Sequence, residues 1–254
     1  MSDVARDEFL IRIRNLHKQL GRQHVLRGVD LDVRRGETLV VIGRSGSGKS
    51  VLLKNIIGLM QPTSGEVIVD GEDVTKLTER KLAAVRKKVG ILFQSGALFD
   101  SMNVETNVGF PLKEIGVKDR QEIDRRVAEA LEMVNLAGEQ KKMPENLSGG
   151  MRKRVGLARA IVSQPEGILY DEPTTGLDPV MSDSINRLIR RLQKRLQVTS
   201  IVVTHDMKSA FHVADQIAYL HEGRIYFKGT ADELRASPDP LIQNFIEGNS
   251  EEND

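Results

Sequence analysis

Residues 38–50 read TLVVIGRSGSGKS, and this stretch decides the class of fold. The run Thr38–Ile42 is short, continuous and apolar, as expected of a strand buried in a parallel sheet. A glycine-rich turn from Gly43 to Gly48 follows it, and the apolar segment Val51–Met60 after the turn favours a helix. A strand, a tight loop and a helix in this order predict an α/β fold with a mostly parallel sheet.

The segment from Gly43 to Ser50 matches the phosphate-loop pattern G-x-x-x-x-G-K-[ST] at every fixed position. Its glycines let backbone N–H groups face phosphate oxygens, and the following helix directs its positive dipole end at the same anion. We expect Lys49 to reach the β- and γ-phosphates of ATP and the Ser50 hydroxyl to ligate Mg²⁺. The alternative, a turn that binds nothing, is disfavoured by the position between a buried strand and a helix. The residues predicted to bind the nucleotide here are Gly43, Arg44, Ser45, Gly46, Ser47, Gly48, Lys49, Ser50 and Val51.

An acidic pair, Asp171 and Glu172, ends another apolar run that starts at Gly167. Asp171 can hold the metal ion, directly or through water. Glu172 can orient and deprotonate the water that attacks the γ-phosphate. Solvated acids at a strand end are a common alternative, but the phosphate loop upstream favours the catalytic interpretation.

The rest of the chain alternates between strand-like and helix-like patterns. Phe9, Ile11 and Ile13 alternate with polar residues, and the strands before residue 40 are expected to form a small antiparallel flank. The pattern changes from Asn103 to about Val162, where Ile123, Val127, Leu131 and Val134 recur at helical spacing, which indicates a helical insertion. We also predict strands at Val29–Val33, Val67–Val69, Val89–Phe93, Ile168–Tyr170 and Ile201–Val203. A helix capped by Asp178 is expected to bury the stripe Ile185, Leu188, Ile189, Leu192 and Leu196. Near the end of the chain we predict a hairpin of Ile217–Leu220 and Ile225–Phe227.

The composition excludes several classes of protein. The 254 residues carry 37 basic and 36 acidic side chains, so no basic excess indicates a nucleic-acid partner. The absence of cysteine excludes disulfides and cysteine metal sites. The polar segment Met1–Glu8 does not resemble a secretory signal, and no apolar run approaches the ~20 residues of a membrane span. The polar tail Asn249–Asp254 is expected to fray.

Leu147-Ser-Gly-Gly-Met151 is a second candidate for anion binding. Ser148 is expected to cap a helix that begins at about Met151, and Gly149 and Gly150 would expose their N–H groups. From these residues alone, a plain helix cap without a ligand is an equally good interpretation.

In this order, the motifs resemble the nucleotide-binding domain of ABC ATPases over about residues 9–247. The resemblance implies an α/β P-loop NTPase (RecA-like) fold with a mostly parallel sheet, an antiparallel β flank and an inserted α-helical subdomain. It implies one domain over residues 1–254, with a core at about 1–95 and 163–248, a helical subdomain at about 96–162 and a tail at 249–254. The segments that carry it are Gly43–Ser50, Gln94, Leu147–Met151, Ile168–Glu172, Thr175–Asp178 and His205.

The resemblance also implies roles for residues that the motifs alone do not assign. Two copies of the chain would sandwich ATP between the phosphate loop of one copy and Ser148, Gly149 and Gly150 of the other. Gln94 would sense the γ-phosphate and Mg²⁺ and couple to a permease. Asp178 would lie in a loop that crosses the dimer interface. The catalytic residues implied are Glu172, His205 and Lys49, the nucleotide contacts include Gln94, Ser148, Gly149, Gly150 and Asp178, and the metal ligands are Ser50, Gln94 and Asp171.

One position departs from the family pattern. The family usually places an aromatic residue under the adenine ring, just before the segment Val25-Leu26, and here that position is Leu20. No aromatic residue occurs between Phe9 and Phe93. We therefore expect weaker nucleobase selection than is typical, because stacking on an aromatic ring is worth ~1–3 kcal/mol.

Finer phrases resemble the ATPase of MCE-associated phospholipid transporters of the Mla or Mkl type. This resemblance implies a multi-span permease and an MCE-domain lipid-binding protein as partners, no nucleic acid, and a peripheral place on the cytoplasmic face of the inner membrane. The alternatives are the ATPase of a polar-solute importer and a cell-division ATPase that signals without cargo. The phrases are Leu92–Val104, Pro111-Leu112, Met143–Arg154 and Asp239–Ile246.

Two further features admit two interpretations each. Ala97-Leu98-Phe99 is either an exposed apolar patch that docks a partner helix or ordinary core packing. The basic runs Arg86–Lys88 and Arg152–Arg154 are expected to be solvated helix faces, with contact to lipid head groups as the alternative. The cations between Arg187 and Arg195 are expected to face solvent.

Overall fold

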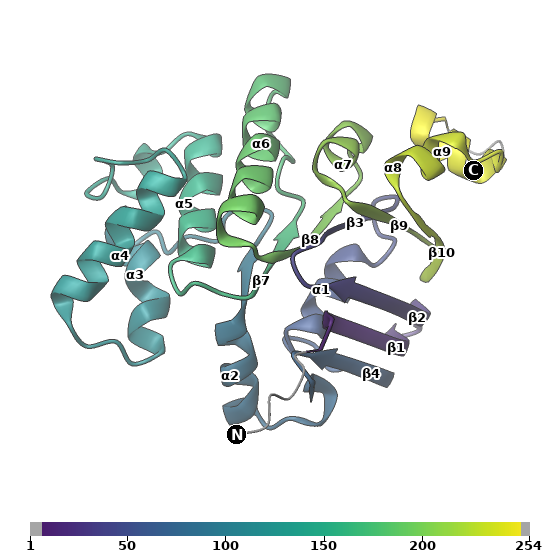
Figure 1. The fold of residues 1–254 in the computed structure, drawn as a ribbon, viewed down its shortest axis with the longest axis horizontal. Coiled ribbons are helices and arrows are strands. Elements are labelled where there is room, and N and C mark those ends of the chain that lie inside the picture. The colour runs from purple at the N-terminus through teal and green to yellow at the C-terminus, as the bar shows by residue number, and fades with distance from the viewer. Residues whose placement is uncertain (1–6, 250–254) are drawn as a thin grey trace. The chain divides into compact units, whose positions relative to one another are not determined.

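The structure is a computed structural model in which residues 7–249 are described (Figure 1). The expectations for Met1–Arg6 and for Ser250–Asp254 fall outside these residues. Contacts divide the chain into two compact units, which are described separately below. Unit 1 takes in residues up to Lys76 and from Ile201 onward, and unit 2 is Leu77–Ser200.

Unit 1 contains a four-stranded antiparallel sheet. Apolar residues at alternate positions of its long strands are buried, which explains why they pair over a common core. The predicted antiparallel flank is therefore present, and two later strands also belong to it. The strand order is β2-β1-β4-β5, with β1 at Phe9–Leu20, β2 at Gln23–Arg34, β4 at Ser64–Val69 and β5 at Glu72–Asp73.

Unit 1 also contains β3 (Thr38–Ile42), whose five residues are all buried. This strand runs parallel to β9 (Gln216–His221), as its continuous apolar character predicts. An antiparallel hairpin joins β9 to β10 (Arg224–Gly229), and Glu222 and Gly223 both have positive φ, 45° and 77°. Two such residues suit a two-residue hairpin turn, so the predicted hairpin is confirmed.

The helix after the glycine-rich turn is shorter than predicted. Helix α1 spans Lys49–Ile56, whereas the sequence predicts a helix from Val51 to Met60. The cause is Gly58, which has a φ of 64° and donates its N–H to the Asn55 carbonyl. A glycine in the left-handed conformation is a common way to end a helix. The other helices of unit 1 are η1 (Val74–Lys76), α7 (Met207–Val213), α8 (Ala231–Ala236) and α9 (Pro240–Glu247).

Unit 2 combines a parallel strand pair with several helices. Strand β6 (Val89–Leu92) is parallel to β7 (Gly167–Asp171). Helices α3, α4 and α5 come between these two strands in the sequence. They pack against one another, as Figure 1 shows. Strand β8 (Thr199–Thr204) crosses the boundary between the units. The helices of unit 2 are α2 (Glu79–Lys88), α3 (Val104–Glu114), α4 (Arg120–Met133), η2 (Pro144–Asn146), α5 (Gly149–Ile161) and α6 (Pro179–Leu196).

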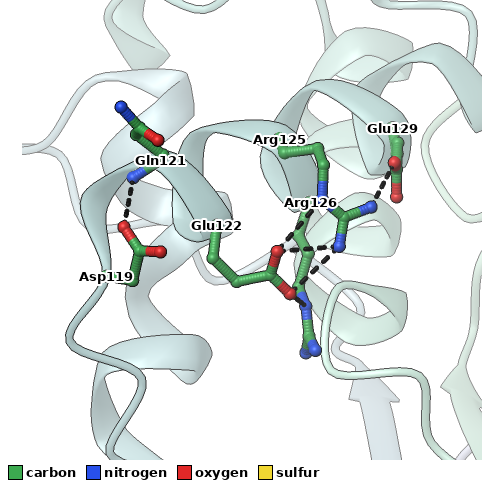
Figure 2. A network of polar contacts seen from close by, with 6 residues as sticks. All are labelled: Asp119, Gln121, Glu122, Arg125, Arg126 and Glu129. Atoms are coloured by element: carbon green, nitrogen blue, oxygen red, sulfur yellow. Dashed lines mark hydrogen bonds and ion pairs between the residues drawn. The ribbon is translucent and has the colours of Figure 1, made fainter.

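Helix α4 shows how one of these helices divides into two faces. Its predicted apolar residues Ile123, Val127 and Leu131 are buried. On the outer face, Glu122 accepts hydrogen bonds from Arg125 and Arg126, and Arg125 also reaches Glu129 (Figure 2). These pairs lie three or four residues apart, the spacing at which helical side chains meet. The Arg125 hydrogen bond is the largest cause of the lowered pKa of Glu122.

Helix α6 is long but not a membrane span. The Asp178 carboxylate accepts hydrogen bonds from the N–H groups of Val180 and Met181, both at 2.9 Å, which confirms the predicted cap. The predicted stripe is buried apart from the half-buried Leu196. The predicted cationic face is exposed except at Arg190, which is half-buried. Across residues 7–249, no helix is both long enough and apolar enough to cross a membrane.

The domain boundaries taken from the sequence remain a prediction. Helices α3, α4 and α5 all fall within the expected helical subdomain at 96–162, and each contacts the other two. Unit 2 is larger than this segment because α2, β6, β7 and α6 also cluster with these helices. The contact division therefore follows local packing and does not test the predicted subdomain.

Candidate nucleotide site

The glycine-rich turn in unit 1 joins β3 to α1 in a backbone path that favours glycine at two positions. Gly46 has a φ of 80° with open space around it, and Gly48 has a φ of 104°. A Cβ at Gly48 would lie 3.0 Å from side-chain atoms of both Val25 and Leu26. The turn is thus tightly packed against the start of β2 on one side.

Lys49 follows this turn and has a buried side chain, only 6% exposed. Its Nζ donates hydrogen bonds to the carbonyl oxygens of Gly43, at 2.7 Å, and Arg44, at 3.0 Å. These contacts hold an ammonium group at the turn that the sequence predicts to bind phosphate. The role of Lys49 in binding phosphate stays a prediction.

The donors at this turn fit a bound phosphate. The Ser47 Oγ is buried and makes no hydrogen bond to any described residue of the chain. Gly48 is the N-cap of α1 and has no side chain that could cap the helix. An anion at this helix N-terminus would accept a hydrogen bond from the Ser47 hydroxyl and interact favourably with the helix dipole.

A metal ion at this turn would depend on the nucleotide for several of its ligands. Within residues 7–249 there is no group of three or more His, Cys, Asp or Glu that could hold a metal. Mg²⁺ usually binds through one or two carboxylates, substrate phosphates and water, so a site without a protein cage suits it. The protein groups that we predict to contact the ion are the side chains of Ser50, Gln94 and Asp171.

The predicted acidic pair in unit 2 is buried rather than solvated. Asp171 ends β7, and both Asp171 and Glu172 are 8% exposed. Glu172 has a φ of 48°, a left-handed conformation that is costly for a residue with a side chain. Thr175 donates from its Oγ1 to the Glu172 Oε2 at 3.1 Å. A buried carboxylate on a strained backbone is the kind of group found at catalytic sites.

The Leu147–Met151 motif forms a capped helix start, as predicted. The Ser148 Oγ accepts a hydrogen bond from the Met151 N–H at 3.2 Å, and Ser148 is exposed. The helix, α5, begins at Gly149, two residues earlier than expected. This geometry shows the cap, while anion binding by Gly149 and Gly150 stays a prediction.

The two remaining predicted residues have exposed side chains. Gln94 follows β6 in unit 2, and His205 follows β8 in unit 1. Asp206, the next residue after His205, caps α7 by accepting a hydrogen bond from the Lys208 N–H at 3.0 Å. An exposed position suits a contact with nucleotide or partner, but the predicted roles of Gln94 and His205 remain predictions.

Comparison with known proteins identifies the family. The family model described as "ABC transporter" matches residues 26–175, which is more than half of the chain. The chain belongs to the ABC transporter family. Its ATP-binding proteins include relatives with different named cargoes, and the chain resembles several of them closely.

Three of these relatives are about equally similar in sequence. The probable ribonucleotide transport ATP-binding protein mkl of Mycobacterium leprae is 41% identical, over 94% of this chain and 69% of that protein. The Fe(3+) ions import ATP-binding protein FbpC of Pasteurella multocida is 41% identical, over 96% of this chain and 68% of that protein. The intermembrane phospholipid transport system ATP-binding protein MlaF of Haemophilus influenzae is 40% identical, over 95% of this chain and 92% of that protein.

A solved structure confirms the fold and the reaction class of this ABC protein. A dimeric ATP-binding cassette bound to ADP and Pi is 33% identical, with a TM-score of 0.80 over 87% of this chain and 98% of that chain. The predicted α/β P-loop fold is therefore correct. The chain is an ATP-hydrolysing subunit of an ABC transporter, with ATP as its nucleotide and Mg²⁺ as the accompanying ion.

The basic run Arg152–Arg154 corrects a prediction from the sequence. Only Arg152 is exposed, whereas Lys153 is 5% exposed and Arg154 is half-buried. Lys153 donates to the carbonyl oxygens of Gln94 and Glu172, and Arg154 donates to the Val134 carbonyl at 2.7 Å and the Ser184 Oγ at 2.8 Å. The expected solvated face is wrong because α5 is covered on several sides. The run Arg86–Lys88 fits the expectation better, since Lys87 is exposed and Arg86 pairs with Glu79.

Lys153 is a candidate site residue that is not among those predicted from the sequence. Burial lowers the pKa of its ammonium, and the carboxylates of Glu172 and Asp171 oppose that shift. A signal was present, because Lys153 lies three residues before Gly156 and four before Leu157, both on the buried side of α5. The three adjacent cations indicate a charged face, whereas the helical spacing indicates that Lys153 is buried.

Leu20 leads to a prediction about the base of the nucleotide. It ends β1 with 41% exposure, and its partner in the β1–β2 ladder is Gln23, two residues before the Val25 that packs on Gly48. An aliphatic side chain stabilises a bound adenine ring less than an aromatic side chain does, because it cannot stack on the ring. We expect ATP and GTP to bind within about tenfold of each other, a difference below ~1.4 kcal/mol. Competitive displacement of a fluorescent ATP analogue measures this ratio.

The same measurement on a Leu20 variant and on the wild type shows whether position 20 or other residues determine the preference for a nucleobase. Leu20→Tyr should tighten binding of both nucleotides, since stacking tolerates any base. A strong preference of the unmodified chain for ATP over GTP would show that other residues select the base.

Proposed function

We propose that this ABC subunit drives phospholipid transport between the membranes of a double-membraned bacterial envelope. The observation that carries the proposal is the 40% identity to MlaF over 92% of that protein's length. The named importer FbpC is as similar in sequence, but the alignment spans only 68% of it. The phrases around Gln94 and Ser148 that resemble the phospholipid group add support.

The mechanism that we propose divides the work among the predicted site residues. Backbone amides of the phosphate loop and Lys49 hold the β- and γ-phosphates. Ser50, Asp171 and Gln94 would hold Mg²⁺, which would supply positive charge next to the phosphate oxygens.

The chemical step is an in-line displacement. Glu172 accepts a proton from water, the water oxygen bonds to the γ-phosphorus, and the bond from that phosphorus to the bridging oxygen of ADP breaks. His205 contacts the γ-phosphate and helps to hold Glu172 and the water. ADP and inorganic phosphate are the products.

The proposed working unit is a pair of these chains on a permease. In the pair, Ser148, Gly149 and Gly150 of one copy face the nucleotide held by the other, and Asp178 lies at the interface. Closing around two ATP molecules and opening after hydrolysis would move the permease helices. We place the pair on the cytoplasmic face of the inner membrane, with an MCE-domain lipid-binding protein as a further partner.

An exposed apolar patch supports docking of a permease helix near Gln94. Ala97 is exposed, and Phe99 is 41% exposed although it contacts Phe110 with ring centroids 5.0 Å apart. Arg159 fixes the loop beneath by donating to the carbonyl oxygens of Gly96 and Ala97, both at 2.8 Å. Exposure of this kind favours a partner surface over ordinary core packing.

Identification of native partners tests this function. The chain is purified with its membrane partners in mild detergent, the partners are identified, and bound small molecules are analysed by mass spectrometry. A multi-span permease, an MCE-domain protein and bound phospholipid are the expected result. A permease carrying a polar solute would leave the ATPase mechanism standing and remove the lipid assignment. A division protein without cargo would favour the signalling alternative.

A further inference from the structure

We propose that Lys153 is a positioning residue that ties the backbone at Gln94 to the backbone at Glu172 and thereby sets the geometry of water activation. The inference rests on the roles proposed above for Gln94 and Glu172. Lys153 donates through one ammonium group to the Gln94 carbonyl and, at 3.2 Å, to the Glu172 carbonyl. All three residues belong to unit 2.

On one side, Lys153 belongs to a set of contacts that hold residues 94–97 on α5. Arg159, six residues later on the same helix, donates to the Gly96 and Ala97 carbonyl oxygens. Gly156 lies between these two cations, and a Cβ there would be 3.1 Å from the Gly96 oxygen. Residues 94–97 are thus held by Lys153 at one end and by Arg159 at the other, and α5 approaches this loop closely at Gly156. A displacement of Gln94 would therefore act on the Lys153 ammonium.

On the other side, Lys153 supports a strained residue. The φ of 48° at Glu172 is a conformation that persists only where surrounding contacts impose it. Two of these contacts are the Lys153 hydrogen bond to its carbonyl and the Thr175 hydrogen bond to its carboxylate. Removing the carbonyl contact would let the peptide relax and move the carboxylate away from its working position.

A flexible cation suits this double contact better than a neutral side chain of the same length. An ammonium carries three donors, so it can serve two carbonyl oxygens from different segments at once. Its burial shows that the contacts replace water around the charge. Methionine is similar in length and fits the same space, but it cannot donate to either carbonyl.

The test compares Lys153→Met in two backgrounds. In the wild-type chain we expect single-turnover ATP hydrolysis to slow about 10–100-fold, the effect of misplacing a catalytic group, while ATP affinity stays within about twofold. In the Glu172→Gln background we expect less than about twofold further loss, because the group that Lys153 positions is already disabled. Lys87→Met, an exposed lysine of the same unit, is the matched control and should change neither quantity.

Several results would overturn the proposal, and they differ from failure of the proposed function. A wild-type rate in Lys153→Met, with Glu172→Gln inactive, would reject Lys153 alone. Equal losses in both backgrounds, with a lower melting temperature, would show a structural role only.

Lys153→Gln, which keeps an N–H donor, provides a second variant if the methionine variant does not fold, and partial recovery of the rate is expected. A Glu172→Gln variant with the wild-type rate would reject the base and this proposal with it.

Discussion

Replacing Glu172 with glutamine is expected to stop ATP turnover while ATP binding is retained. Glutamine has the same size as glutamate and can still accept the hydrogen bond that Thr175 donates at 3.1 Å, so the buried site should keep its shape. It cannot take a proton from water at neutral pH. Removing a general base typically slows a reaction by ~10²–10⁴-fold, or ~2.7–5.5 kcal/mol in the activation barrier.

The same variant should trap the paired state. If hydrolysis opens the pair, a chain that binds Mg-ATP without hydrolysing it accumulates as a dimer. Phosphate release gives the rate, and light scattering after size exclusion in Mg-ATP gives the mass. Glu132→Gln, an exposed glutamate on α4, is the control and should behave like the wild type. Hydrolysis by Glu172→Gln at an unchanged rate would show that another group activates the water.

The sequence was sufficient for the elements whose apolar pattern is unambiguous. Strand β3 is a continuous apolar run that could only be buried, and the β9–β10 hairpin has Gly223, which adopts positive φ readily, between alternating strands. Asp178-Pro179 marks the start of α6 by cap chemistry alone. In each case, one local rule and the burial pattern agree, so tertiary packing had nothing to override.

The boundary errors have local causes that compete with the pattern. Apolar residues continue past Ile56, but the left-handed Gly58 ends α1 before they can be helical. Helix α5 begins at Gly149 rather than Met151, because a cap binds an N–H two or three residues further along. Periodicity therefore locates a helix more reliably than its ends.

Only the site residues that belong to sequence motifs could be predicted. The phosphate loop and the acidic pair are marked by residue type, and the structure adds that Asp171 and Glu172 are buried. Lys153 carries no motif of its own, and its significance depends on carbonyl oxygens from two distant segments. Contacts to backbone atoms leave no trace in the identity of the partner residue, so sequence reasoning does not find them.

Replacing Lys49 with alanine is expected to weaken ATP binding itself. The Lys49 ammonium lies at the phosphate loop, 2.7 Å from the Gly43 carbonyl oxygen, and it is the group predicted to reach the β- and γ-phosphates. A hydrogen bond to a charged group contributes ~1.5–3 kcal/mol, so the dissociation constant for ATP should rise about 10–150-fold. Equilibrium titration with a fluorescent ATP analogue measures the change.

The interpretation of that result depends on separating charge from loop structure. Alanine also removes the donor to the Gly43 and Arg44 carbonyl oxygens, so the loop could loosen as well as lose its cation. Lys54→Ala, on the same helix, controls for removing a lysine from α1. Lys49→Met keeps the buried volume without the charge and should weaken ATP binding as much as alanine does. Unchanged affinity in both Lys49 variants would mean that backbone amides alone hold the phosphates.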